Sequence, residues 1–279
     1  MRYQEYYPKP PLRRFIECFW TLESTSTSEL TQPERILPDG CVELILNFGD
    51  RFSQHQPDKK ITQPSHFLVG QMTGPILISP TGIVELIGIR FHPGGTSPFF
   101  RFSLAEITDQ VVELGSIAAS LERELLAAST HLRTTPARVT AIEQLLLKRA
   151  LSSKHDSSIV GVAEKIVDAA GVVSVDVLAG EAGISTRQLE RRFLREVGIG
   201  PKLLSRILRF QQVFRAVEAC EGEWAPVAIE CGYYDQAHLI RDFNQFARQT
   251  PAVLFAEHSA LTESFTRKTR TSNFSNTVI

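Results

Sequence analysis

The chain has 279 residues, of which 43% are hydrophobic, and its formal net charge is −1. It is long enough for two domains with ordinary cores. The near-neutral charge excludes a protein that is basic throughout, so binding to nucleic acid must depend on where the charges lie. We find no signal-peptide pattern and no apolar run of the roughly 18 residues that a membrane helix needs. We therefore expect a cytoplasmic protein without a membrane partner.

The four cysteines are scattered along the chain and form no CxxC pair. This pattern favours free thiols over a disulfide framework. His66 and His92 lie in the first half of the chain without HxH or HxxxH spacing. We therefore expect neither a metal site nor another cofactor.

The first half of the chain is predicted to be β-rich. Gly- and Pro-containing turns separate short β-prone runs at 19–22, 41–48, 67–70, 76–78 and 83–91. This pattern is typical of a small barrel or sandwich. The polar stretches 24–33 and 51–65 are expected to be loops. Apolar residues then recur at helical spacing over 114–127 and 139–150, which predicts two helices that follow the sheet.

A change of composition divides the chain. Residues 152–158 are small and polar, which is typical of a linker, and the part that follows has helical periodicity. We therefore predict an α+β protein with a β-rich effector or dimerisation domain over 1–151 and an all-α domain over 159–257. The last stretch, 258–279, is rich in Ser, Thr and Asn and is predicted to be a disordered tail.

The stretch 185–195 predicts an amphipathic helix. Ser185 suits the N-cap, Leu189, Phe193 and Leu194 form an apolar stripe, and four arginines lie on the remaining surface. The residues before it indicate a short helix that ends at Gly183. A short helix, a glycine turn and an Arg-rich helix together predict a helix-turn-helix unit that binds in the DNA major groove.

This motif has a second copy. The pattern Ala-x-x-x-Gly occurs at 179–183 and again at 228–232, and Leu-x-Arg-x-Phe occurs at 189–193 and again at 239–243. Two copies at an offset of about 50 residues favour a repeated structural unit over a chance match. Residues 201–217 predict a connecting helix about 25 Å long. A rigid spacer of that order can hold two recognition helices near the ~34 Å that separates successive major-groove faces.

Charge is distributed unevenly over the helical half. Residues 185–215 contain eight basic and two acidic side chains, whereas 216–235 contain five acidic and no basic ones. We therefore expect the first recognition helix and the spacer to provide most of the attraction for phosphate. The simpler alternative is that these arginines only solvate the exposed faces of a helical domain, and the duplicated motif argues against it.

The helical half resembles the DNA-binding domain of AraC-type bacterial transcriptional regulators. The resemblance is carried by 178–193 with Gly198 and Pro201, by 206–211, and by 228–243 with Thr250 and Pro251. It implies a seven-helix domain in which a long helix joins two helix-turn-helix units. The chain departs from the family pattern at Gly200, where Ser or Thr is common.

The resemblance also implies which side chains meet DNA. The residues expected at base edges are Thr186, Arg187, Glu190, Arg191, Gln236, Ala237, His238 and Arg241. The residues expected at phosphates are Ser185, Arg195, Lys202 and Arg206. Ser185 is a helix cap first and a phosphate contact second, and His238 is equally well explained as a solvated helix residue.

Segments 38–45, 69–75 and 88–94 resemble a β-rich, cupin-like domain found in front of AraC-type DNA-binding domains. An effector pocket there is a hypothesis with four candidate residues. These are Glu43, Glu85, Arg90 and His92. A carboxylate inside an apolar barrel needs a partner or a ligand. The simpler interpretation, which we favour at this point, is that Glu43 and Glu85 face solvent on half-exposed strands.

We therefore predict a sequence-specific DNA-binding transcriptional regulator and not an enzyme. Double-stranded DNA is the expected partner, and a small-molecule effector, RNA polymerase and a second copy of the chain are further candidates. One alternative is a DNA-docked alkyl-acceptor or enzyme-like protein that uses Cys18 or Cys41. Another is a helical interaction module without a role on DNA.

Overall fold

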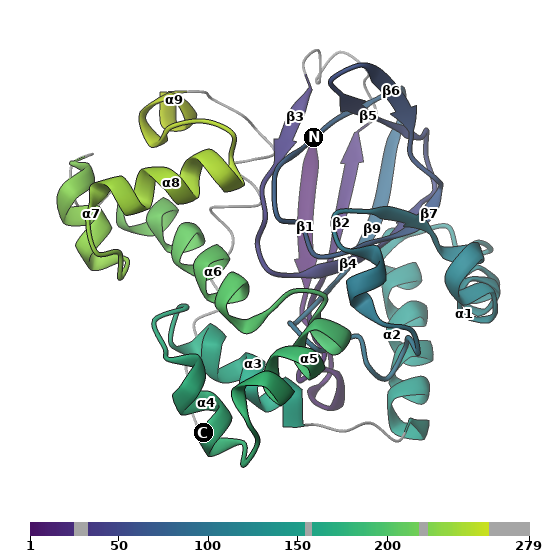
Figure 1. Cartoon of the computed structure of the whole chain (residues 1–279). Coiled ribbons are helices and arrows are strands. Elements are labelled where there is room, and N and C mark those ends of the chain that lie inside the picture. Colours follow the sequence, from purple (N-terminus) through teal and green to yellow (C-terminus); the bar gives the residue numbers. More distant parts are fainter. Residues whose placement is uncertain (25–32, 154–157, 218–222, 257–279) are drawn as a thin grey trace, which may run out of the picture.

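The computed structural model describes residues 1–24, 33–153, 158–217 and 223–256 (Figure 1). Its first part contains two antiparallel sheets. The six-stranded sheet has the order β1 (Arg2–Tyr6), β2 (Ile16–Ser24), β9 (Val84–Phe91), β4 (Val42–Asn47), β7 (His66–Val69), β10 (Val111–Glu113). The four-stranded sheet has the order β3 (Glu34–Ile36), β8 (Ile76–Pro80), β5 (Phe52–Gln56), β6 (Lys59–Thr62).

The predicted loop at 51–65 is wrong, because this segment forms the antiparallel pair β5 and β6. Strand β5 buries only Phe52 fully, and all of β6 is exposed, so neither strand has an apolar alternation. These strands form because their backbones pair within the sheet, where β5 lies next to β8. The sequence pattern also did not predict the short strand β3 and the N-terminal strand β1, because neither strand has an apolar alternation.

The two faces of the six-stranded sheet belong to different cores. Val42, Leu44 and Leu46 lie on one face and pack with residues of two helices, α1 (Leu114–Ser129) and α2 (Thr135–Ser152). Trp20 and Ile45 lie on the other face, toward the four-stranded sheet. The predicted helices are therefore confirmed, and they cover one side of the sheet (Figure 1).

Gly88 in β9 is needed for the close approach of Trp20 in the neighbouring strand β2. These two residues are register partners in the antiparallel pair. A Cβ atom at position 88 would lie only 2.0 Å from Cε2 of the Trp20 indole. The indole therefore occupies the space that a side chain at this position would take.

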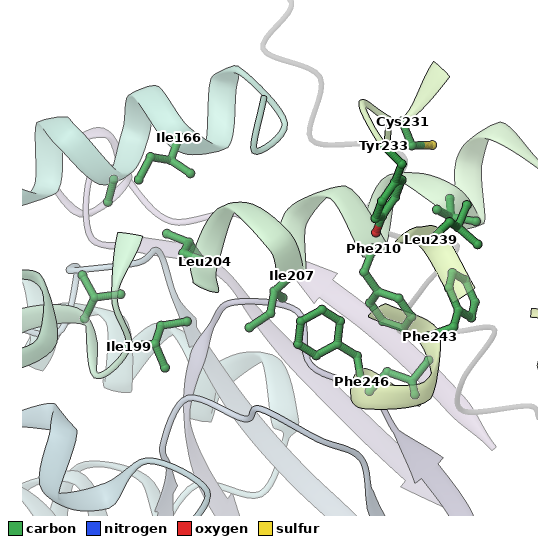
Figure 2. Packing of buried hydrophobic residues seen from close by; sticks show 14 of the residues in the cluster. Ile166, Ile199, Leu204, Ile207, Phe210, Cys231, Tyr233, Leu239, Phe243 and Phe246 are labelled. Carbon is green, nitrogen blue, oxygen red and sulfur yellow. The ribbon is translucent and has the colours of Figure 1, made fainter. Parts of the chain in front are cut away.

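The second part of the chain is helical. Its helices are α3 (Ser158–Asp168), α4 (Val175–Glu181), α5 (Thr186–Val197), α6 (Pro201–Ala216), α7 (Trp224–Glu230), α8 (Gln236–Phe246) and α9 (Pro251–Ala256). Helix α6 is central, and Figure 2 shows Ile207 and Phe210 on it facing residues of the other helices. The Phe210 ring lies 4.8 Å from Phe243 and 5.4 Å from Phe246, centroid to centroid. This aromatic cluster fixes α8 against α6.

The β-rich part packs directly against the helical part. Leu37, just after β3, is buried in the core of the helices. Thr108 donates a 2.6 Å hydrogen bond from Oγ1 to the carbonyl of Gly198, directly after α5. Arg35 donates from Nη1 to the carbonyl of Ala247, directly after α8, at 3.1 Å. The β-rich part is therefore attached to the helical part at the ends of both α5 and α8.

Three sequence predictions fall partly or wholly outside the described residues. The predicted loop 24–33 is described only at its two end residues, of which Ser24 belongs to β2. The predicted linker 152–158 is described only at its ends, where α2 finishes at Ser152 and α3 begins at Ser158. The predicted disordered tail 258–279 lies outside the described residues. Within the described ranges, no helix has the length and apolarity that would let it cross a membrane.

Candidate DNA interface and effector pocket

The first helix-turn-helix unit consists of α4 and α5. Gly183 has a φ of +66°, a left-handed conformation that suits glycine at this turn. Ser185 accepts a hydrogen bond from the backbone of Gln188, whose side chain in turn accepts from the Ser185 backbone. This capping box fixes the start of α5. Leu189 and Phe193 are completely buried, so the opposite face of α5 is directed outward.

The predicted base-contacting residues of α5 lie on that outward face. Arg187, Glu190 and Arg191 are exposed, and they line an open groove together with Ser103 of the β-rich part. Thr186 is half-buried and donates from Oγ1 to Asp176 at 2.9 Å. One feature of the predicted apolar stripe is wrong, because Leu194 is 43% exposed and lines the same groove.

The second unit, α7 and α8, repeats this geometry. Gly232 has a φ of +74°, and the side chain of Asp235 accepts a 2.6 Å hydrogen bond from the backbone of His238 at the start of α8. Gln236, Ala237 and Arg241 are exposed, and Leu239 and Phe243 are completely buried. The side chain of His238 is half-buried and its ring lies edge-on to Tyr233 at 5.1 Å.

The residues expected at phosphates fall into two groups. Lys202 is exposed at the start of α6, and the exposed Arg195 forms an ion pair with its neighbour Glu196. Arg206 is held inside the domain, where Nη2 lies 2.6 Å from Oδ1 of Asp242. This ion pair favours a structural role for Arg206 over contact with phosphate. Ser185 is exposed and acts as the cap of α5.

A cavity of about 80 Å³ lies between the two sheets. Its walls are largely apolar, and α6 contributes to them through Gln211. The Gln211 side chain is buried and donates a 2.6 Å hydrogen bond from Nε2 to the carbonyl of Pro38. The helix that joins the two helix-turn-helix units therefore also lines this cavity.

The polar end of the cavity is an ion cluster around Arg90. The Arg90 Nε atom lies 2.8 Å from Oε1 of Glu43, and Nη2 lies 3.6 Å from Oδ2 of Asp39. Trp20 also donates to Glu43 Oε1, at 3.0 Å. Burial raises the pKa of Asp39 to about 6, and the Arg90 guanidinium partly opposes that increase. Glu43 and Arg90 thus lie together at the cavity, as the pocket hypothesis required.

The other two candidate pocket residues lie elsewhere. Glu85 is at the start of β9, forms an ion pair with Arg138 of α2 and does not line the cavity, and its side chain is 34% exposed. His92 is half-buried at the end of β9 and does not line the cavity. Sequence reasoning missed two cavity residues: Asp39, in the segment just before β4, and Gln211, on the predicted connecting helix.

The cysteine hypothesis finds no support in this geometry. Cys18, Cys41 and Cys231 are free thiols, and Cys220 lies outside the described residues. Burial and neighbouring carboxylates raise the pKa of Cys41 well above its usual value, and burial raises that of Cys18. A thiol acts as a nucleophile through its thiolate, so both environments disfavour an alkyl-acceptor reaction. In the described ranges no cluster of three or more His, Cys, Asp or Glu residues is arranged to hold a metal.

Two family models match the chain. Residues 4–113 match a domain of unknown function, DUF6597, and residues 178–257 match a helix-turn-helix domain. No curated protein sequence matches. Among solved structures, apo ToxT from Vibrio cholerae has 10% identity and a TM-score of 0.42, with 90% of this chain and 99% of ToxT covered.

Two further structures show the same distant likeness. Unsaturated-fatty-acid-bound ToxT has 10% identity and a TM-score of 0.40, with coverage of 85% of this chain and 92% of ToxT. The AraC-like transcriptional activator CuxR has 11% identity and a TM-score of 0.25, with coverage of 77% of this chain and 87% of CuxR.

The duplicated helix-turn-helix and the match over 178–257 define a DNA-binding protein. In this chain a DUF6597 domain over 4–113 precedes a helix-turn-helix domain of the AraC type over 178–257. The chain is a DNA-binding transcriptional regulator.

Proposed function

We propose that this regulator reads two successive major-groove segments of one DNA site, with α5 in the first and α8 in the second. The observation that carries the proposal is that both helices present an exposed, capped N-terminal face while α6 holds them in one core. The side chains proposed at base edges are those predicted from the sequence: Thr186, Arg187, Glu190, Arg191, Gln236, Ala237, His238 and Arg241. In this proposal α3 to α9 are the seven-helix double unit.

The first unit dominates the electrostatic attraction in this proposal. Arg187 and Arg191 are exposed on α5, and Arg195 and Lys202 extend the positive surface toward α6. On α8 the exposed cation is Arg241, and the exposed Asp235 at its N-cap opposes phosphate. We therefore expect the first unit to contribute more to DNA affinity than the second, because Lys and Arg side chains neutralise DNA phosphates.

We further propose that a small molecule bound between the sheets controls DNA binding. Gln211 supports this, because it lies in the cavity wall and also on the helix that positions both recognition helices. A ligand that changes the Gln211–Pro38 contact changes the position of α6, and an effector acts only through such a difference between two states. The sheets are the cupin-like barrel of this proposal, with the domain boundary at 152–158.

Selection of bound fragments from a genomic library tests the DNA-binding proposal. The full chain is expected to enrich a site with two half-elements about one helical turn apart, and binding should weaken steeply as salt is raised. Enrichment of a single short element, without contribution from a second, would contradict the two-segment mode. If the full chain shows no salt-dependent binding to DNA, the DNA-binding proposal is refuted and a helical interaction module is favoured.

The same proposal includes where the protein acts, whether two copies pair, and which protein of the transcription machinery it contacts. A regulator of chromosomal DNA acts in the cytoplasm of a bacterium, and contact with RNA polymerase and pairing of two copies are its expected interactions. Sedimentation of the protein with and without a selected site measures the pairing. One protein per site would exclude the dimer.

A further inference from the structure

The turn of the second helix-turn-helix unit is one residue longer than the turn of the first. The amide of Ile184 in the first unit and the amide of Tyr233 in the second each donate to the carbonyl five residues earlier, at 3.1 and 2.9 Å. In the first unit the N-cap Ser185 then follows directly. In the second unit Tyr234 stands before the N-cap Asp235. Tyr234 is therefore the additional residue.

Tyr234 has no part in the aromatic packing of its own unit. Its side chain is 87% exposed, whereas the preceding Tyr233 is 3% exposed and belongs to the core of the helices. The Tyr233 ring lies edge-on to His238 at 5.1 Å, and the guanidinium of Arg209 lies 5.3 Å from the centre of that ring. The stability of the turn thus depends on Tyr233, and the position of Tyr234 calls for another explanation.

Tyr234 begins an exposed run that continues into the recognition helix α8. Asp235, Gln236 and Ala237 are also exposed, and the last two are proposed base contacts. A residue directly before a recognition helix lies at the edge of the groove that the helix enters, where the DNA phosphates are. A tyrosine hydroxyl can donate a hydrogen bond to a phosphate oxygen.

We propose that Tyr234 donates from its hydroxyl to a DNA backbone phosphate beside the second major-groove segment. This inference rests on the proposed two-segment mode of binding and adds a contact that positions the second recognition helix. The charge of the second unit explains why a neutral donor suits this place. Residues 216–235 contain five acidic and no basic side chains, so a cation here would be partly neutralised by them, whereas a hydroxyl keeps its capacity to donate.

Tyr234→Phe tests the proposal in the full-length protein, because it removes only the hydroxyl. We expect affinity for the selected DNA site to fall about three- to tenfold, the loss expected for one hydrogen bond. The salt slope should stay unchanged, because a neutral donor releases no condensed counterion. Tyr7→Phe is the matched control, since Tyr7 is 60% exposed in the β-rich part, and it should bind as the wild type does.

Two altered duplexes locate the contact. On a duplex that ends before the second half-element, Tyr234→Phe and the wild type should bind equally. Replacement of single phosphates in the second half-element by neutral methylphosphonate should weaken the wild type at one position, and Tyr234→Phe should lose nothing further there. Circular dichroism checks that the variants are folded.

The outcomes separate this inference from the proposed function. Wild-type affinity of Tyr234→Phe for the full site overturns the inference, and so does an equal loss on the shortened duplex or a reduced salt slope. A loss in Tyr234→Ala without a loss in Tyr234→Phe assigns the effect to the ring and also overturns the hydrogen bond. If the wild type itself binds the shortened duplex as tightly as the full site, the two-segment mode fails, and the Tyr234 contact fails with it.

Discussion

Arg206 on α6 and Asp242 on α8 form a partly buried ion pair in which Nη2 and Oδ1 are 2.6 Å apart. The Asp242 side chain is 1% exposed, and Arg206 also donates to Gln245 at 2.6 Å. The pair links the spacer helix to the second recognition helix. Its position makes Arg206 a determinant of domain geometry.

Arg206→Met should therefore destabilise the protein strongly. Removal of the guanidinium leaves the Asp242 carboxylate buried without its cation, and such losses cost about 3 kcal/mol of unfolding free energy. Arg195→Met is the matched control, because Arg195 is 63% exposed and its pair with Glu196 contributes on the order of 0.5 kcal/mol. Urea unfolding of both variants measures the difference, and equal destabilisation would contradict the structural role.

Arg191→Ala should weaken binding to the selected DNA site by about 1–3 kcal/mol and relax base preference at one position. Lys202→Ala should instead weaken all sequences alike and reduce the salt slope by about one unit. Arg123→Ala is the control, because Arg123 is exposed on α1, outside the two helix-turn-helix units. Binding titrations over a salt series distinguish base contacts from phosphate contacts, and identical behaviour of Arg191→Ala and Lys202→Ala would refute the assignment.

Arg187→Ala should reduce DNA affinity more than Arg241→Ala. Both side chains are exposed on recognition helices, but α5 lies in the segment 185–215 with its net charge of +6. The segment before α8 carries five acidic side chains, which repel phosphate. Competition binding at low salt measures the two losses. A larger effect of Arg241→Ala would show that the second unit dominates.

Gly88→Ala should disrupt the wall of the cavity. The added Cβ atom would meet the Trp20 indole at 2.0 Å, and overpacking of this kind costs about 1–3 kcal/mol of unfolding free energy. Gly161→Ala in α3 is the control, because nothing lies within 4 Å of its added Cβ and alanine favours a helix by about 1 kcal/mol. Thermal unfolding should move in opposite directions for the two variants. Tryptophan fluorescence should change only for Gly88→Ala.

The half-buried Asp39 predicts a dependence of stability on pH. Its pKa is raised from the usual 3.8 to about 6, so between these values the folded state binds more protons than the unfolded state. The contribution of Asp39 to stability therefore falls as pH rises from about 4 to about 6. Asp39→Asn should remove this fall, and Asp58→Asn should keep it. Unfolding free energies at a series of pH values check the sign, and a rise with pH would contradict it.

Much of the DNA-binding half could be predicted because its signals are local. A cap at Ser185, a glycine at 183 and buried Leu189 and Phe193 lie within a few turns of chain, and helical periodicity needs no distant partner. The second copy then confirms the first, since Gly232 adopts the same left-handed turn conformation. Helix propensity and periodicity determine such elements wherever the rest of the chain lies.

The residues that line the cavity could be predicted only in part, because the partner of a strand side chain depends on which segment the fold places opposite it. Glu43 and Glu85 each lie in a strand with apolar neighbours, but one meets Arg90 at the cavity and the other meets Arg138 on a helix. Strand pairing decided which face each occupies. Residues distant in sequence, such as Gln211 and Pro38, lie together only after the two domains pack.

The sequence by itself thus determined the class of protein and the two recognition helices, since those depend on short-range periodicity, caps and turns. Only the tertiary structure decided that Arg206 pairs with Asp242, that Asp39 belongs to the Arg90 cluster, and that the spacer helix lines the cavity. The physical reason is that burial and electrostatic environment are set by contacts between distant segments, which no local pattern records.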